Sequence, residues 1–373
     1  MHHRSRRSRP RPSSALGSCV VLLTLLAGAC GTTGATEGPA SDPLTISATT
    51  TVMGDVVRNV APDTAEVSVL MEPGTDPHTF EPSARQLAEL HEADLVVANG
   101  GGLEAGLGAA LDDTKAAGVP VFSALEHVTA LGGDDAHGGD ATEDGDAGDD
   151  EHSWDDHDDE HSEDGGHHSD AGGDDAQGGD ATEDGHAGAE DHDHGGVDPH
   201  FWMDPLRMAE AVEALGAQIG ELTGTPQHST DRAQRYGAEL RDLDRRIAAL
   251  LNDVPEDRRT IVTNHDALAY FADRYDLRVA GTVIPGVTTG AEPSARDLEQ
   301  LADALRREGI TTIFTDSTAS AQMARTLAGE VGPDTAVVEL YTGSVGGDEE
   351  GGPESYVDML MTDAERISEA LRR

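Results

Sequence analysis

Aromatic residues, cysteines and basic residues are all scarce in this sequence of 373 residues. Aromatics make up 3% of the chain, which is too few for a base-stacking platform or an aromatic sugar-binding cleft. The only two cysteines, Cys19 and Cys30, fall within the first thirty residues, so the remainder has no disulfide framework and no cysteine-based zinc site. Lysine and arginine number 25 against 72 acidic residues, and the formal net charge of −47 repels nucleic acid and anionic lipid. We therefore expect no nucleic-acid partner and a chain that attracts cations.

The first 42 residues have the pattern of an export signal followed by a tether. Arginines crowd the start, and residues 15–29 then carry no charge, which suits the apolar region of a signal peptide but is too short to span a bilayer. Small residues precede Cys30, and this resembles a bacterial lipobox, in which the cysteine is lipidated and becomes the new N-terminus. We predict a signal peptide over residues 1–30, a lipid anchor on Cys30 and a flexible tether over residues 31–42. The alternative is an ordinary secreted protein in which this cysteine is incidental.

A second unusual segment, residues 132–197, contains 25 acidic residues, nine histidines and no basic residue. It includes a tandem duplication, because residues 132–148 recur as residues 172–188 with two differences. Such a composition cannot bury enough apolar surface to offset its ordering entropy, so we expect this insert to be disordered. It is either a solvated spacer or an auxiliary segment with several weak zinc sites, since closely spaced imidazoles chelate metal. The histidines concerned are His137, His152, His157, His161, His167, His168, His186, His192 and His194.

Strands alternate with helices on either side of the insert, which predicts an α/β fold. Hydrophobic residues make up 36% of the chain, enough for a buried core, and apolar runs such as residues 95–98 suit buried parallel strands. We expect two lobes with mostly parallel sheets, residues 43–131 and 253–373, while residues 198–252 complete the first lobe and supply a long linking helix near residues 231–251. The predicted strands cover residues 44–48, 65–70, 95–98, 119–122, 260–263, 277–283, 312–314 and 336–340. Binding sites in such folds lie at the carboxyl ends of strands and in the crevice between lobes.

Three histidines outside the insert lie in loops at predicted strand ends. His78 and His200 each belong to an Asp-Pro-His sequence with a further proline beyond it, and these prolines fix the backbone that carries the imidazole. His265 directly follows the strand predicted at residues 260–263 and precedes a helix. Neutral imidazole suits zinc, and three imidazoles with an open or water-filled fourth position make a tetrahedral site. One such histidine alone is more often an ordinary loop residue, but three in matched positions predict a metal site.

The segments around these histidines resemble a known family. They are Asp76-Pro77-His78 with Glu81-Pro82, the run from Ala93 to Gly100 with Leu103-Glu104, the segment from Asp198 to Pro205, and the segment from Asn264 to Phe271. Together they resemble the ZnuA/TroA-like solute-binding proteins of cluster A-I, the metal-binding subunits of bacterial zinc and manganese ABC importers. The resemblance covers roughly residues 44–373 and implies two α/β lobes joined by one long rigid helix, with the metal between the lobes. An acidic, histidine-rich insert before the second ligand motif is familiar in the zinc-specific members.

The sequence departs from this family at the expected fourth ligand. Many relatives carry an aspartate in a Tyr-x-Asp-Ser-Leu-like segment, whereas this sequence reads Tyr341-Thr342-Gly343-Ser344-Val345. In this alignment Gly343 supplies no ligand, which leaves water or a nearby carboxylate such as Asp348. A site rich in imidazole and poor in carboxylate favours Zn²⁺ over Mn²⁺. The same open position is also what a catalytic zinc shows.

The expected function is high-affinity capture of Zn²⁺ and its delivery to an ABC importer, without enzymatic activity. The expected partners are a membrane permease and its cytoplasmic ATPase, and we expect a monomer held by its lipid on the extracytoplasmic face of the bacterial cell membrane. The alternatives are a manganese-specific importer subunit, a surface lipoprotein that buffers metal or mediates adhesion, and a secreted zinc hydrolase. A hydrolase needs a general base, for which Asp266 or Glu81 is available, but the sequence has no H-E-x-x-H or comparable compact motif.

Overall fold

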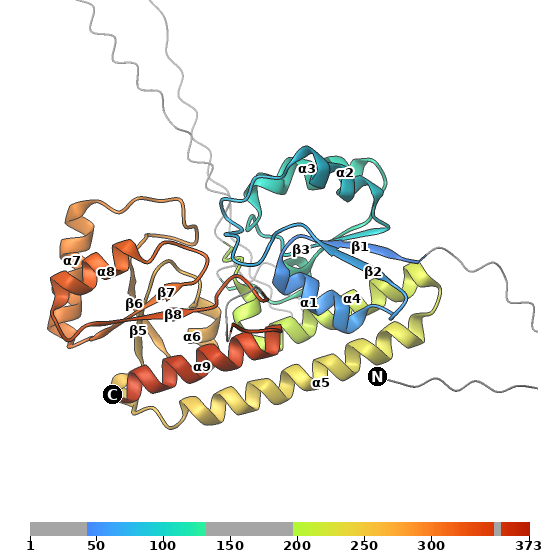
Figure 1. Cartoon of the computed structure of the whole chain (residues 1–373). Helices are drawn as coiled ribbons and strands as arrows, with labels where there is room; N and C mark the ends of the chain where they lie inside the picture. The colour runs from blue at the N-terminus through green and yellow to red at the C-terminus, as the bar shows by residue number, and fades with distance from the viewer. Residues whose placement is uncertain (1–42, 132–196, 347–351) are drawn as a thin grey trace, which may run out of the picture. The chain divides into compact units, whose positions relative to one another are not determined.

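The computed structural model describes residues 43–131, 197–346 and 352–373 (Figure 1). The predicted signal peptide and tether with Cys30, the acidic insert with its nine histidines, and Asp348 lie outside these residues. The described residues belong to one compact unit, Pro43–Arg373, in which strands and helices alternate as the sequence predicts. No helix in the described part of the chain is long and apolar enough to cross a membrane.

The first lobe is built on a four-stranded parallel sheet with strand order β2-β1-β3-β4. Side chains alternate across it, so Leu95 and Val97 pack on the face covered by α1, whereas Val96 between them packs toward α2 and α3 (Figure 1). All four strands are parallel, so the loops that follow them leave from one edge of the sheet. The elements are β1 (Thr45–Ala48), α1 (Thr51–Val60), β2 (Glu66–Val69), α2 (Ala84–Glu92), β3 (Leu95–Ala98), α3 (Gly108–Ala116) and β4 (Val121–Ser123).

Two long helices, α4 (Pro205–Thr223) and α5 (Pro226–Leu251), follow the first lobe and form its base. Each begins with a proline, which suits the first turn of a helix because it has no N–H to leave unpaired. The predicted start of α5 at residue 231 was therefore too late. The 26 residues of α5 span about 39 Å, enough to run from the first lobe to the second (Figure 1).

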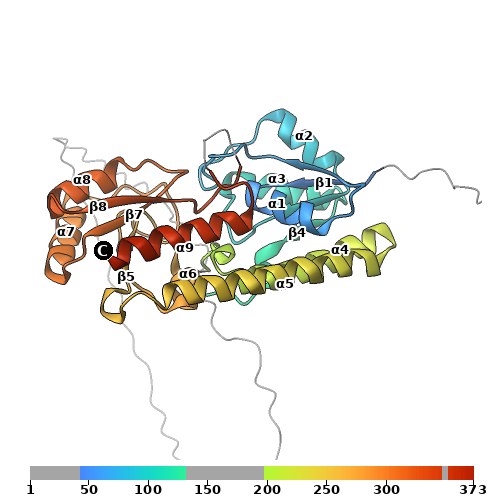
Figure 2. The ribbon, with the colours of Figure 1, turned by 60° about the horizontal axis from the view of Figure 1, so that its bottom comes forward.

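The second lobe contains two pairs of parallel strands, β5 with β6 and β7 with β8, which form separate two-stranded sheets. Its last helix, α9, begins beside the first lobe and runs alongside α5 into the second lobe (Figure 2). Strand β7 continues to Asp316, two residues beyond its predicted end. The elements are β5 (Thr260–Thr263), α6 (Ala269–Tyr275), β6 (Arg278–Thr282), α7 (Ala295–Glu308), β7 (Thr312–Asp316), α8 (Gln322–Val331), β8 (Ala336–Leu340) and α9 (Tyr356–Arg372).

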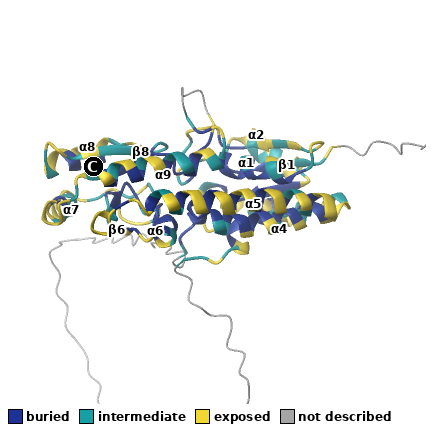
Figure 3. Ribbon diagram, turned by 90° about the horizontal axis from the view of Figure 1, so that it is seen from below, coloured by how far each residue is buried: buried dark blue, intermediate teal, exposed yellow. Residues whose placement is uncertain are grey.

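One hydrophobic cluster extends through both lobes. It includes Phe201 and Met203 in the short 3-10 turn before α4, Phe271 on α6, and Tyr356 on α9, all fully or almost fully buried. Exposed residues line the outer side of α5 and α9, shown in yellow in Figure 3. Because both lobes share this packed interior, the loops between them rest on a continuous apolar base.

Candidate metal centre

Three histidines from distant parts of the sequence meet between the two lobes. His78 lies in the loop after β2, His200 precedes the 3-10 turn Phe201–Met203, and His265 directly follows β5. Their ring centroids are 5.2 Å apart for His78 and His200, 5.4 Å for His78 and His265, and 5.2 Å for His200 and His265. One nitrogen of each lies within 4.8 Å of the others, and His200 and His265 are only 1% and 2% exposed. The structure thus brings the three predicted residues together.

The spacing of the imidazole nitrogens fits a small metal ion. The Nε2 atoms of His78 and His200 are 3.2 Å apart. Two nitrogens bound to one tetrahedral zinc lie about 3.3 Å apart, given a zinc–nitrogen bond of about 2.0–2.1 Å. The cavity that these rings line has a volume of about 10 Å³, which is room for roughly one water-sized particle.

The two Asp-Pro-His sequences fold in the same way. Asp76 accepts a hydrogen bond from the backbone N–H of His78, and Asp198 accepts one from that of His200, both at 2.9 Å through Oδ1. Asp198 Oδ1 also lies 2.7 Å from Nδ1 of His200. A carboxylate there fixes the proton on Nδ1 and leaves the lone pair of Nε2 free, which is how metal-binding histidines are commonly oriented.

His265 is held differently, by the end of its strand. Thr263 donates its hydroxyl to the carbonyl oxygen of His265 at 2.7 Å, which closes the turn after β5. Nδ1 of His265 is buried and has no partner among the described residues, and neither does the side-chain amide of Asn264. The turn after β5, rather than a neighbouring carboxylate, therefore fixes where this imidazole lies.

Burial keeps the imidazoles of His78 and His265 neutral. It lowers the pKa of His78 to about 4 and that of His265 to about 2, and the neighbouring imidazoles act in the same direction because a second positive charge is unfavourable. Neutral imidazole is the form that binds metal, so protons do not compete for these two residues at neutral pH.

The segment Tyr341–Val345 connects the second lobe to both histidine loops of the first. The indole Nε1 of Trp202 donates to the carbonyl oxygen of Thr342 at 2.7 Å, next to His200. The hydroxyl of Ser344 accepts from the N–H of Gly74 at 2.8 Å, in the loop that leads to His78. These bonds hold Gly343 at the wall of the histidine cavity, where it offers no side chain.

Two polar residues of this wall were missed from the sequence, Asp316 and Thr342. Asp316 ends β7 and is only 5% exposed, and burial raises the pKa of its carboxyl. An aspartate at the carboxyl end of a parallel strand could have indicated Asp316 as a site residue, but the predicted strand ended at Phe314, two residues earlier. Among the described residues no carboxylate oxygen joins the three nitrogens within 4.8 Å, and neither Glu81 nor Asp266, the bases considered for a hydrolase, lines the cavity.

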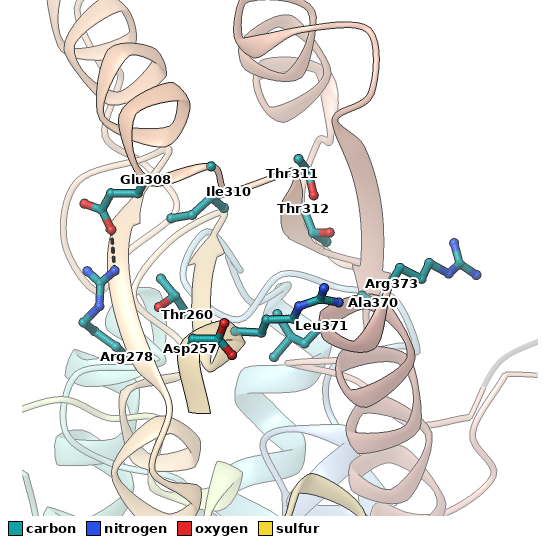
Figure 4. Close-up of a pocket in the computed structure, with 12 residues that line it drawn as sticks. Asp257, Thr260, Arg278, Glu308, Ile310, Thr311, Thr312, Ala370, Leu371 and Arg373 are labelled. Carbon is teal, nitrogen blue, oxygen red and sulfur yellow. Dashed lines mark hydrogen bonds and ion pairs between the residues drawn. The ribbon is translucent and has the colours of Figure 1, made fainter. Parts of the chain in front are cut away.

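A larger cavity of about 310 Å³ lies at the opposite end of the second lobe's strands (Figure 4). Its wall includes Thr260 and Thr312, which begin β5 and β7. Arg278 and Glu308 there form an ion pair with each other (Figure 4). Ligands of parallel α/β sheets bind at the carboxyl ends of strands, where the histidines lie, and not at this end.

Comparison with known proteins agrees with this arrangement. A family model described as "Zinc-uptake complex component A periplasmic" matches residues 46–370. The zinc-binding lipoprotein AdcA of Streptococcus pneumoniae is 26% identical over 308 residues, which are 82% of this chain and 51% of AdcA, so the chain spans about half the length of that relative. The zinc-binding protein TroA of Treponema pallidum is 25% identical over 363 residues, 95% of this chain and 98% of TroA. The manganese-binding lipoprotein MntA of Halalkalibacterium halodurans is 22% identical over 342 residues, 91% and 93% of the two chains.

The fold is also that of a solved structure. The periplasmic zinc-binding protein TroA from Treponema pallidum superposes with a TM-score of 0.67 and 24% identity, over 89% of this chain and 100% of that one. This likeness confirms the predicted fold class, two α/β lobes joined by the long helix α5.

Proposed function

The chain belongs to the zinc-uptake complex component A family, and from this membership we propose that it captures a divalent metal ion and delivers it to an ABC importer. The family is one of solute-binding components and not of enzymes. The observation that supports capture of an ion is the cluster of His78, His200 and His265, which combines nitrogens from both lobes around a space of about 10 Å³. Ligands drawn from two lobes let the lobes hold the ion between them.

We propose zinc as the ion. Three imidazoles that no carboxylate oxygen of the described residues joins within 4.8 Å form a small site that suits zinc, whereas manganese prefers oxygen ligands. The second candidate is manganese, which is favoured by the similarity to MntA, a manganese-binding lipoprotein.

Metal titration of the purified protein tests both assignments. We expect one zinc ion bound tightly, manganese bound far more weakly, and loss of the tight site when His78, His200 and His265 are all replaced by alanine. His228→Ala, at an exposed position of α5, is the matched control and should leave the tight site intact. Tight zinc binding by the triple variant would contradict the assignment, and tighter binding of manganese than of zinc would select the second candidate.

We further propose that the partners are a membrane permease with its ATPase, and that acylated Cys30 holds the protein on the extracytoplasmic face of the cell membrane. The lipoproteins AdcA and MntA among the relatives support an anchor. Two acyl chains bury enough methylene groups for stable attachment. Cys30→Ala should move the protein from the membrane fraction to the soluble fraction, and unchanged fractionation would contradict the anchor.

The insert of residues 132–197 is proposed as an auxiliary zinc-binding segment. Its nine histidines among 25 acidic residues support several weak sites, with affinities of roughly micromolar order because each must order a flexible chain. Deleting the insert should remove these weak sites and leave the single tight site. Equal zinc stoichiometry with and without the insert would make it a spacer.

A further inference from the structure

A second small cavity borders His265, at the carboxyl ends of β5 and β7. Its volume is about 10 Å³, and its wall includes Asn264 and His265 just after β5 and Thr315 on β7. His265 also lines the cavity that contains the other two imidazoles. Strands β5 and β7 contact each other but belong to separate sheets, and no hydrogen-bonded ladder pairs them in the described part of the chain. The second cavity therefore lies where the two sheets of the second lobe meet without backbone pairing.

Three residues of this wall carry buried polar side-chain atoms that have no hydrogen-bond partner among the described residues. These atoms are Nδ2 and Oδ1 of Asn264, Nδ1 of His265 and Oγ1 of Thr315, and each residue is at most 3% exposed. The hydroxyl of Thr342 on the same wall is engaged with the carboxylate of Asp316 and is not part of this group. Buried polar atoms without partners cost free energy, and native proteins rarely leave several of them together. The group therefore indicates a ligand in the cavity.

The kinds of atom in this group identify the ligand. The amide of Asn264 offers both a donor and an acceptor, and the hydroxyl of Thr315 acts as either. A cation would leave the donors unpaired, and an anion would leave the acceptors unpaired. Water both donates and accepts, and a cavity of about 10 Å³ has room for one water molecule. The cavity thus matches water in size and in hydrogen-bonding capacity.

We propose that Asn264, Thr315 and Nδ1 of His265 hold one buried water molecule, which joins β5 to β7 and fixes the proton of His265 on Nδ1. The water accepts the Nδ1 proton and donates to the amide oxygen of Asn264 and to the hydroxyl of Thr315. It is not a ligand of the metal, because it occupies the other of the two cavities that His265 lines.

This water would give the third imidazole the kind of partner that Asp198 gives to His200, whose Nδ1 lies 2.7 Å from the carboxylate. With its proton on Nδ1, His265 keeps the lone pair of Nε2 free for the cavity that it shares with the other two imidazoles. Asn264 and Thr315 are then positioning residues, which act on the ion only through His265.

NMR of the full chain, free of metal and labelled with nitrogen-15 in its histidines, tests this site, and His265→Ala identifies the resonance. We expect a proton on Nδ1 of His265 and a nuclear Overhauser contact between that proton and water. Asn264→Leu replaces the amide by an apolar side chain of similar size. It should lower the ratio of the Nδ1-protonated to the Nε2-protonated form by about fivefold, because a hydrogen bond is lost. Thr315→Val should lower this ratio by a smaller factor, whereas Thr315→Ser keeps the hydroxyl and should preserve it.

Thr114→Val is the matched control. Thr114 lies on α3 of the first lobe, is 0% exposed, and carries a hydroxyl that also has no partner among the described residues, but it lines neither cavity. Its substitution should change neither the protonation of His265 nor the water contact. A bare Nδ1 on His265 in the unmodified protein, or a protonated Nδ1 without a contact to water, would overturn the inference. Should Asn264→Leu not fold, unchanged protonation in Thr315→Val would overturn it.

The effect of this water on zinc binding rests on the proposed function. Loss of the outer partner of a metal-binding histidine costs about 10–100-fold in affinity, so Asn264→Leu should weaken zinc binding by about tenfold and Thr114→Val should not. Equal zinc affinity in Asn264→Leu and the unmodified protein would overturn the positioning role.

The two sets of measurements separate this inference from the proposed function. If the unmodified chain binds no zinc, the proposed function fails, whereas the water contact in the metal-free protein still decides the inference. If the three histidines bind zinc tightly and Nδ1 of His265 has no contact with water, only the inference fails.

Discussion

The two lobes contribute imidazoles to one site but prepare them in different ways. In the first lobe, His78 and His200 each follow an aspartate whose carboxylate accepts their backbone N–H, and Asp198 also contacts the ring of His200. In the second lobe, His265 has no such aspartate, and its Nδ1 is without a partner in the described part of the chain. A short local motif thus fixes the backbone of two of the histidines and the ring of one of them, whereas only the folded second lobe places the third.

This difference affects how much each ring must still be ordered when a ligand binds. A ring that is fixed by its own turn needs little further ordering when a ligand arrives, so less binding free energy is lost. His265 instead depends on β5, which it follows, and on the groups packed around it. The contrast can be tested by removing the ligands and their supports separately.

The largest effect is expected from removing a ring. His200→Ala and His265→Ala should each weaken zinc binding by more than about a hundredfold, above the 10–100-fold typical of losing an outer partner, because the shell is left incomplete. Competition with a chelator of known affinity measures the loss. A small loss for His265→Ala alone would show that the first lobe binds the ion without the second.

Removing a supporting carboxylate should have the next largest effect. Asp198→Asn should weaken zinc binding by about 10–100-fold, because the amide no longer fixes the proton on Nδ1 of His200. Asp76→Asn should cost less, since Asp76 accepts hydrogen bonds from the backbone of His78 and the hydroxyl of Thr289 but, among the described residues, none from the ring of His78. Equal losses for the two variants would contradict the different roles assigned to the two aspartates.

Adding a carboxylate to the second lobe should have a moderate effect. In Gly343→Asp, the new Cβ would lie 3.5 Å from Oγ1 of Thr318 and 3.7 Å from Cδ of Pro77, which are ordinary contacts, so the backbone here accepts a Cβ without a clash. The new carboxylate should raise metal affinity by about tenfold or shift preference toward manganese, because it fills the open position with a harder ligand. Unchanged zinc and manganese affinities would show that Gly343 does not face the ion.

The smallest effect is expected from lowering the pH from 7 to 6, which should leave His78 and His265 unprotonated. Because the pKa of His78 is about 4 and that of His265 about 2, both rings stay neutral in this interval, whereas an ordinary imidazole with a pKa of about 6.5 becomes mostly protonated. The pKa values of both histidines are lower in the folded protein than in the unfolded chain. Their contribution to the free energy of unfolding is therefore fully present above about pH 6.5 and is lost as the pH falls toward 4. Nitrogen-15 NMR of the metal-free protein follows each ring, and a midpoint for His78 near 6.5 would contradict its burial.

Local features and the three histidines were predictable from the sequence, whereas the other residues of the cavity wall were not. The strand at residues 95–98 was predicted with its exact bounds because a continuous apolar run is a local signal, and the Asp-Pro-His turns are likewise complete within a few residues. Asp316 and Thr342 were missed because their importance arises only from packing. The carbonyl oxygen of Thr342 accepts a hydrogen bond from Trp202, which is 140 residues earlier in the chain. A hydrophobic pattern along the sequence cannot indicate a contact between residues so far apart.

Two helices, α5 and α9, connect the lobes and limit how the lobes can move relative to each other. Helix α5 packs tightly against α4, where a Cβ on Gly216 would lie 2.5 Å from that of Ala233. Helix α9 begins on the first lobe, where the N–H of Tyr356 donates to Asp55 at 3.0 Å, and continues beside α5 into the second. Two helices that run side by side between the lobes oppose both a rotation of one lobe against the other and a wide separation of the lobes. For the proposed ion we therefore expect release through small displacements of the segment Tyr341–Val345, at a rate that follows the stability of its few hydrogen bonds rather than a large opening of the lobes.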